Sequence, residues 1–236
     1  MITLYGSSPM FGLPQASAFV AKAELLLKFS GLHYKGAKAD LRKAPKGKMP
    51  YIDDDGAVIA DSAFIRMHLE EKYGVDFSGG YSPREQGVGW ALNALLEDHI
   101  YWLNIHDRWM DDENFFKGPV QFFNDAPAII RPLIIKMVRK QVRKNGRAHG
   151  LGRHTAVERL QLGKKAVDSV SDILGGNAYA LGNRVCGTDA SVYGMMGSLS
   201  CAYFRSEIGD YARTKTNIMG YLKRMTAEFY PDFANA

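Results

Sequence analysis

Cysteine, long apolar runs and leader-like features are scarce or missing in this sequence of 236 residues. The two cysteines, Cys186 and Cys201, are too few for a disulfide framework and form no Cys-x-x-Cys pair. We interpret them as reduced thiols, which are typical of cytoplasmic proteins. No apolar run approaches the roughly 18 residues of a membrane span, and the first residues lack the regions of a secretory signal. We therefore expect a cytoplasmic protein without a membrane partner.

Acidic residues are nearly absent from one long segment. Residues 131–165 hold eleven lysines and arginines but one acidic residue, Glu158, in a chain whose net charge is +5. Such a basic segment raises nucleic acid as a partner. It has no Phe, Tyr or Trp that could stack on bases. We interpret it as a solvated helix face and keep nucleic-acid binding only as a minor alternative.

The clearest local pattern lies in residues 48–62. The run Asp53-Asp54-Asp55-Gly56 separates two short β-prone segments, Tyr51-Ile52 and residues 57–60. Asp-Gly between such segments predicts a tight hairpin turn. Ser62 then precedes a helix-periodic apolar run and is interpreted as the N-cap of that helix.

The whole chain divides into an α/β half and an all-helical half. A strand at 2–5, a helix ending at Gly31, a strand at 34–41 and the hairpin with its helix predict a thioredoxin-like domain over residues 1–74. Residues 75–81 are interpreted as a linker, and residues 82–236 as an all-helical domain. Its first helix starts at the capping box Ser82-Pro83-Arg84-Glu85. The expected helices extend from there to about 110 and over 128–144, 155–175, 189–204 and 216–230.

The segments Lys48-x-Pro50-x-Ile52, Asp55-Gly56 and Ile59-x-Asp61-Ser62 resemble the first half of glutathione transferases. The resemblance implies a cis bond between Met49 and Pro50, with the Met49 main chain pairing with the cysteinyl part of glutathione. It also implies that Asp61 and Ser62 hold the γ-glutamyl end, and a helix start suits that carboxylate. The alternative is that Ser62 is only a cap and Asp61 only complements the helix dipole.

Further motifs resemble the failed axon connections and metaxin-like branch of the same superfamily. They are Ser17-Ala18-Phe19-Val20-Ala21-Lys22-Ala23-Glu24, Gly150-Leu151-Gly152-Arg153-His154-Thr155, Tyr221-Leu222-Lys223-Arg224-Met225 and Phe229-Tyr230-Pro231-Asp232. Two positions depart from the branch pattern: Ala18 replaces a proline, and Cys186 stands where a helix cap is expected. Because cysteine caps poorly, we expect Thr188 to cap one turn later.

Glutathione chemistry requires a residue that stabilises the thiolate, since the neutral thiol is a weak nucleophile. Ser17 lies at the expected start of the first helix, where a hydroxyl and the helix dipole act together. Tyr5 is the alternative, because the resemblance includes transferases that use a tyrosine hydroxyl from the first strand. The competing interpretations are a plain N-cap for Ser17 and a packed strand residue for Tyr5. The first 80 residues contain no cysteine, which argues against the glutaredoxin-like classes.

The resemblance implies an enzyme that conjugates glutathione to a small hydrophobic electrophile or uses it to reduce peroxides. The alternative is a non-catalytic adaptor with the same fold. His99 and His106 are seven residues apart on one helix face but have no second ligand cluster, so no metal is expected. Aromatic residues between 101 and 123 are expected to supply both core and pocket wall. The family architecture also implies a homodimer.

Overall fold

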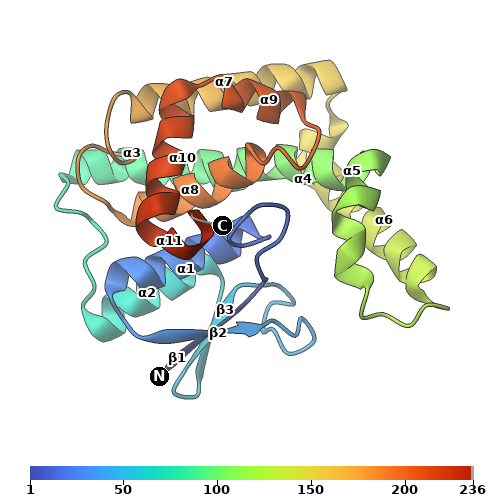
Figure 1. The fold of residues 1–236 in the computed structure, drawn as a ribbon, viewed down its shortest axis with the longest axis horizontal. Coiled ribbons are helices and arrows are strands. Elements are labelled where there is room, and N and C mark those ends of the chain that lie inside the picture. Colours follow the sequence, from blue (N-terminus) through green and yellow to red (C-terminus); the bar gives the residue numbers. More distant parts are fainter. Residues whose placement is uncertain (235–236) are drawn as a thin grey trace.

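The computed structural model describes residues 1–234. A four-stranded mixed sheet with strand order β2-β1-β3-β4 forms the first half. Its strands are β1 (Ile2–Gly6), β2 (Tyr34–Lys38), β3 (Tyr51–Asp54) and β4 (Ala57–Ala60). β1 pairs parallel with β2, and the other neighbouring pairs are antiparallel. Figure 1 shows α1 (Ala18–Ser30) and α2 (Ser62–Tyr73) between this sheet and the helices of the second half. The thioredoxin-like order predicted from the sequence is confirmed.

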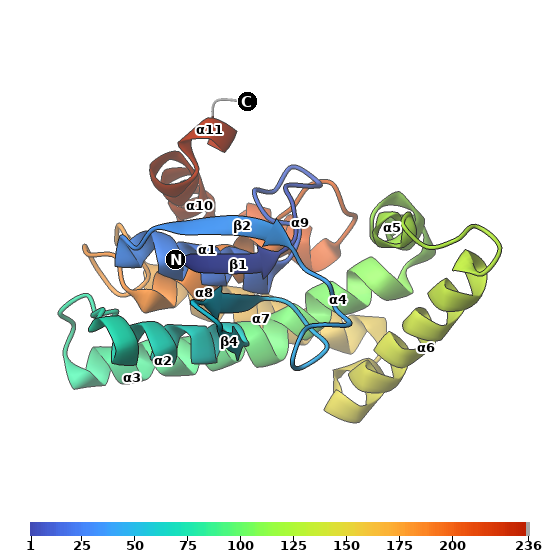
Figure 2. The ribbon, with the colours of Figure 1, turned by 90° about the horizontal axis from the view of Figure 1, so that it is seen from below.

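The rest of the described chain is helical, as predicted. The α-helices are α3 (Pro83–Ala94), α4 (Tyr101–Met110), α5 (Asp112–Lys117), α6 (Arg131–His149), α7 (Ala156–Leu174), α8 (Gly187–Leu199), α9 (Glu207–Arg213), α10 (Thr216–Phe229) and α11 (Pro231–Ala234). A π-helical turn, Leu95–Ile100, joins α3 to α4, and short 3-10 segments lie at Pro119–Phe123 and Leu151–Arg153. Figures 1 and 2 both place α6 at the edge of the molecule.

Several predicted boundaries are wrong for local reasons. The short helices α5 and α9 were not predicted, and each begins at a side-chain cap, Asp111 and Ser206 respectively. The helix expected over 189–204 is α8, which starts at Gly187. Cys186 occupies its N-cap position, where the Asp189 carboxylate accepts the Cys186 N–H at 2.9 Å. Thr188 is therefore not the cap: it is the second residue of the helix, and Asp189 in the first turn reaches back to the main chain of the N-cap residue.

The predicted hairpin turn is confirmed. β3 and β4 pair from Tyr51 with Ala60 to Asp54 with Ala57. The two loop residues have positive φ angles, 53° at Asp55 and 92° at Gly56. This is the backbone that a two-residue type I′ turn requires and that Asp-Gly tolerates well.

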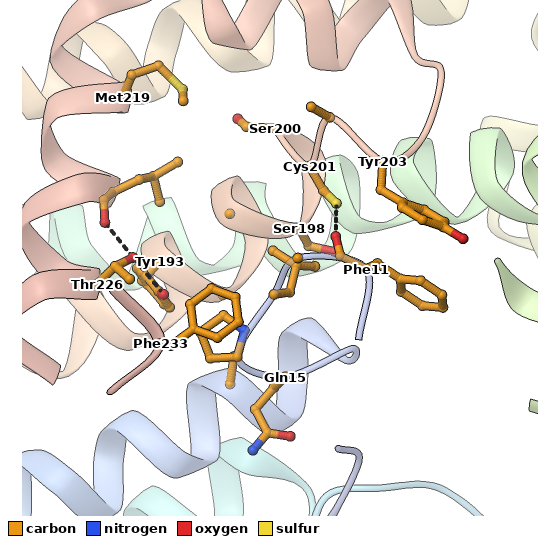
Figure 3. A pocket seen from close by; sticks show the side chains of 18 residues that line it. Phe11, Gln15, Tyr193, Ser198, Ser200, Cys201, Tyr203, Met219, Thr226 and Phe233 are labelled. Atoms are coloured by element: carbon orange, nitrogen blue, oxygen red, sulfur yellow. Dashed lines mark hydrogen bonds between the residues drawn. The ribbon is translucent and has the colours of Figure 1, made fainter. Parts of the chain in front are cut away.

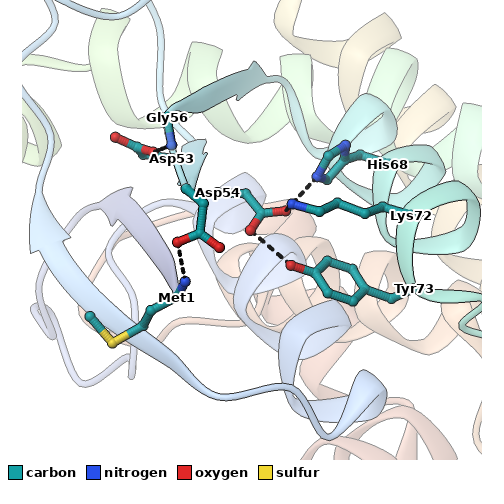
Figure 4. Close-up of polar contacts among 8 residues, drawn as sticks. Met1, Asp53, Asp54, Gly56, His68, Lys72 and Tyr73 are labelled. Atoms are coloured by element: carbon teal, nitrogen blue, oxygen red, sulfur yellow. Dashed lines mark hydrogen bonds and ion pairs between the residues drawn. The ribbon is translucent and has the colours of Figure 1, made fainter.

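The strand before this turn is tied to α2 by a buried carboxylate. Asp54, 1% exposed, accepts from His68 Nε2 at 2.7 Å, Lys72 Nζ at 2.7 Å and Tyr73 Oη–H at 2.8 Å (Figure 4). Burial alone would raise the pKa of Asp54, but hydrogen bonds from Lys72, His68 and Tyr73 outweigh it and lower the pKa to about 2. The carboxylate therefore stays ionised and holds α2 against the sheet.

The hydrophobic core continues across both halves of the chain. Leu26 of α1, Ile65 of α2 and Met196 of α8 belong to one buried cluster. A Cβ on Gly194 of α8 would lie 2.5 Å from the Ala18 carbonyl oxygen, so glycine permits the close approach of α8 to α1. Lys22 of α1 adds an ion pair of 2.6 Å with Glu97 of the π-helical turn.

Candidate functional site

Ser17 and Met49 lie in distant parts of the first half but line one cavity of about 330 Å³. Ser17 is the N-cap residue of α1 and has an extended backbone, yet its side chain makes no capping hydrogen bond. Its N–H instead donates to Ser7 Oγ at 3.2 Å, and Ser7 lines the same cavity. The Ser17 hydroxyl is thus placed at a helix start beside a cavity and makes no capping hydrogen bond.

The opposite wall of this cavity comes from the helical half. Its members are mostly aromatic or long side chains of α4 and of the segments that follow: Tyr101, Asn104, Ile105, Arg108, Trp109, Phe122, Phe123 and Phe204. Of the aromatics singled out in the sequence, four therefore face the cavity. Phe115 is fully buried in the core, and Trp102 stacks on His149 at 4.9 Å instead. The wall is suited to a small apolar molecule.

Arg108 is a member of this wall that the sequence did not single out. It is 6% exposed, and its guanidinium lies 4.3 Å from the centroid of the Phe204 ring. Burial lowers the pKa of Arg108 to about 10, so the side chain stays protonated at neutral pH. The spacing of Tyr101, Asn104 and Arg108 by three and four residues could have shown that they share one helix face.

The glutathione-like motif forms a second group at the start of α2. The Met49–Pro50 bond is cis, as the resemblance implied. The Pro50 carbonyl accepts the Asp61 N–H at 3.1 Å, which joins the proline turn to the start of the helix. Asp61 has a φ of 86°, a conformation that non-glycine residues rarely adopt and that often occurs at functional sites.

The prediction that Ser62 caps α2 is wrong. Asp61 is the N-cap residue, and its Oδ1 accepts the Ala63 N–H at 3.0 Å. Ser62 is the first helical residue, 1% exposed, and its buried Oγ has no hydrogen-bond partner among residues 1–234. A buried hydroxyl without a partner is uncommon. At a helix start, it is suited to an incoming carboxylate. The free N–H groups of this helix start are the feature that suits the carboxylate of a glutamyl group.

The structure does not bring all candidates to one cavity. Asp61 and Ser62 do not line the cavity that Ser17 and Met49 share. Tyr5 also lies outside that lining, because its ring stacks on Tyr51 with centroids 4.6 Å apart and an angle of 8° between the planes. This packing is the strand role weighed as the alternative for Tyr5.

A second cavity of about 480 Å³ lies between the loop before α1 and helices α8, α10 and α11. Figure 3 shows Gln15, Tyr193, Cys201 and Phe233 around it, with the Cys201 Sγ–H donating to the Phe11 carbonyl at 3.1 Å. Neither Ser17 nor Met49 lines this cavity. The smaller cavity is therefore the better candidate for thiol chemistry.

Residues 1–234 contain neither a metal-binding cluster nor a membrane-spanning helix. That part of the chain gathers no group of three or more His, Cys, Asp and Glu side chains able to hold a metal ion. None of its helices combines the length and the apolar character needed to cross a bilayer. His99 and His106 are half-buried, and burial lowers the pKa of both, to about 4 for His106.

Comparison with known proteins gives curated relatives along most of the chain. The isoprene-epoxide–glutathione S-transferase of Rhodococcus sp. (strain AD45) is 29% identical over 238 residues, covering 97% of this chain and 99% of the relative. Failed axon connections of Drosophila melanogaster is 29% identical over 248 residues, which cover 99% of this chain and 59% of that longer protein. Metaxin-2 of Mus musculus is 18% identical over 192 residues, or 80% of this chain and 73% of the relative.

Solved structures and family models agree with these relatives. The beta-etherase LigF from Sphingobium sp. strain SYK-6 has a TM-score of 0.64 at 17% identity, covering 98% of this chain and 99% of the other, which shows a shared fold. The glutathione S-transferase N-terminal domain model matches residues 18–114, and the C-terminal domain model matches residues 163–225. Together the two models match more than half of the chain. The chain therefore belongs to the glutathione transferase superfamily, and its resemblance to the failed axon connections and metaxin-like branch is confirmed.

Proposed function

We propose that this protein binds glutathione and conjugates it to small electrophiles. The observation that carries the proposal is the meeting of Ser17, at the start of α1, with Met49, which precedes the cis proline, in one aromatic-walled cavity. An epoxide is the kind of electrophile named for the Rhodococcus relative. Reduction of peroxides by the same bound thiol is the alternative reaction, because it needs the same activated nucleophile.

In this proposal each site residue has a separate role. The Met49 main chain pairs with the cysteinyl part of glutathione, while Asp61 and Ser62 hold its glutamyl end at the α2 N-terminus. Ser17 donates a hydrogen bond to the thiolate at the α1 N-terminus. A free thiol with a pKa of about 8.5 is only a few per cent ionised at neutral pH, so this stabilisation increases the fraction of the reactive thiolate.

The test measures the ionisation of the bound thiol by ultraviolet titration in wild type, Ser17→Ala and Tyr5→Phe. A hydrogen bond to an anion contributes roughly 1.5–3 kcal/mol, so Ser17→Ala should raise the thiol pKa by about one to two units. Glutathione affinity, measured by isothermal titration calorimetry, should change little in Ser17→Ala. Tyr5→Phe is the matched control and should leave both quantities unchanged, because Tyr5 packs on Tyr51.

Two results would contradict this assignment. A pKa shift in Tyr5→Phe and none in Ser17→Ala would transfer the role to Tyr5. Failure of wild type to bind glutathione at millimolar concentration would remove the proposed function itself.

A non-catalytic adaptor is the second candidate, and the surface of α6 favours it. No residue of α6 is buried, although the helix is amphipathic. Ile129 just before it is 95% exposed, and Leu133 and Met137 on it are 60% and 62% exposed. Exposed apolar groups of this kind often mark a protein contact. Capture of a protein partner that Leu133→Asp abolishes, by a chain that does not bind glutathione, would support the adaptor.

We further propose a homodimer and a cytoplasmic location. Val58 on β4, Phe64 and Met67 on α2 and Trp90 on α3 are large apolar residues with 45% to 61% of their surface exposed. Figure 2 shows these three elements along one side of the molecule. A second copy that packs there would cover them. The free thiols of Cys186 and Cys201 support the cytoplasm.

A further inference from the structure

The cavity lined by Ser17 and Met49 contains a buried positive charge. Among the described residues of its lining, Arg108 alone is charged. Its Nη2 donates to the Ser198 carbonyl oxygen, and its buried Nε–H has no partner within residues 1–234. None of the ion pairs among these residues includes Arg108. Because burying a cation without an anion is costly, the cavity is prepared to receive negative charge.

Arg139, on the neighbouring helix α6, has both an aromatic ring and a carboxylate as partners. Its guanidinium lies 4.4 Å from the Phe115 ring centroid, much as Arg108 lies against Phe204. Arg139 also forms an ion pair of 2.6 Å with Asp112. Arg139 does not line the cavity of Arg108. The two arginines thus share an aromatic contact and differ in the carboxylate, which makes Arg139 a matched control.

The guanidinium of Arg108 is also held in place. Ser198 accepts the Arg108 N–H with its carbonyl oxygen, and its Oγ accepts Asn104 Nδ2–H at 2.9 Å. Phe204 covers one face of the guanidinium at 4.3 Å. These contacts fix the planar group before a ligand arrives, and such preorganised donors are effective at stabilising a developing charge.

We propose that Arg108 selects electrophiles in which an oxygen atom carries or develops a negative charge. This inference rests on the proposed function and names its substrate class. The oxyanion is either a carboxylate of the substrate or the alkoxide released from an epoxide. In the epoxide reaction the thiolate sulfur forms a bond to carbon and the carbon–oxygen bond breaks with its electron pair on oxygen. Arg108 donates a hydrogen bond to this alkoxide, and water supplies its proton.

The first experiment needs no glutathione. Calorimetry measures the binding of 4-methylbenzoate and of the uncharged 4-methylbenzamide to wild type, Arg108→Gln, Arg108→Lys and Arg139→Gln. The benzoate should bind Arg108→Gln about tenfold to a hundredfold more weakly, while Arg139→Gln stays within about threefold of wild type. Arg108→Lys keeps the cation but loses the planar, stacked guanidinium, so its affinity should fall between those of Arg108→Gln and wild type. The benzamide should bind wild type and the three variants with similar affinity. Because Arg108→Lys keeps the charge, its behaviour separates loss of the cation from damage to the fold.

The second experiment compares the conjugation of benzyl chloride, 4-(chloromethyl)benzoate and styrene oxide. Arg108→Gln should keep most of its activity on benzyl chloride and lose at least about tenfold on one oxyanion substrate. If Arg108→Gln raises the KM for 4-(chloromethyl)benzoate, Arg108 binds a carboxylate that the substrate already carries. If it lowers the kcat for styrene oxide, Arg108 stabilises the alkoxide that develops during the reaction. If wild type turns over none of the three, the proposed function fails and benzoate binding still decides the role of Arg108. Equal losses on all three substrates, or equal benzoate binding by wild type and Arg108→Gln, would overturn the inference.

Discussion

Replacing Ser62 by alanine should increase the stability of the ligand-free protein and weaken its binding of glutathione. The Ser62 Oγ is buried and has no partner in the described chain. An unsatisfied buried hydroxyl costs about 1–3 kcal/mol, and alanine is a good residue inside a helix. We therefore expect Ser62→Ala to raise the free energy of unfolding by about 1 kcal/mol when no ligand is present.

The same substitution removes a donor from the proposed glutamyl site. A hydrogen bond to a charged group contributes roughly 1.5–3 kcal/mol, which corresponds to a loss of about tenfold to 150-fold in affinity. Urea unfolding without ligand and calorimetry with glutathione measure the two effects. A rise in the free energy of unfolding together with a fall in glutathione affinity would show that the hydroxyl serves ligand binding and destabilises the ligand-free protein.

Ser82→Ala is the matched control for this experiment. Ser82 caps α3 on the surface, where its Oγ accepts the Glu85 N–H. Loss of such a cap lowers stability by about 0.5–2 kcal/mol, and glutathione affinity should stay unchanged. If Ser62→Ala behaves like Ser82→Ala, lowering stability and leaving affinity intact, Ser62 is a structural residue and the glutamyl site lies elsewhere.

Two further predictions concern Asp54 and assembly. Because the pKa of Asp54 is lowered to about 2 in the fold, Asp54→Asn should lower the free energy of unfolding by roughly 2 kcal/mol at pH 7. The stability from this carboxylate is present above its unfolded pKa of about 3.9 and is lost as the pH falls through about 2. The difference from wild type in urea unfolding should therefore shrink between those values, and a constant difference would contradict the assignment. For assembly, light scattering should give twice the chain mass for wild type and the single mass for Trp90→Glu, and a monomeric wild type would exclude the dimer.

Local sequence signals predicted the parts of this fold that depend on neighbouring residues. The Asp55-Gly56 turn and the capping box at Ser82 are both predicted correctly, because each is complete within four residues. The cap of α2 was assigned to Ser62 because serine is a good cap. Asp61 is the cap instead: its Oδ1 accepts the Ala63 N–H, and its own N–H donates to the carbonyl oxygen of Pro50, which lies outside the helix.

The candidate site likewise contains residues that local motifs predict and one residue whose role depends on distant parts of the chain. Ser17 and Met49 were found through motifs in the sequence, and the structure places them in one cavity. Arg108 could not be recognised as an unpaired cation, because that property depends on Ser198 and Phe204, ninety or more positions away. The sequence can show that an arginine shares a helix face with apolar residues, but it cannot show whether an Asp or Glu side chain forms an ion pair with that arginine.

The glycine contact between α8 and α1 sets a limit on how such chains can recombine. Gly194 admits the Ala18 carbonyl at a distance that leaves no room for a side chain, and the Lys22–Glu97 pair crosses the same boundary. A chimera that takes its first half from one relative and its second half from another must therefore match at both contacts. Substitutions at one side of either contact are thus expected to require a compensating substitution on the other side, even though the sequence predicts two separate domains.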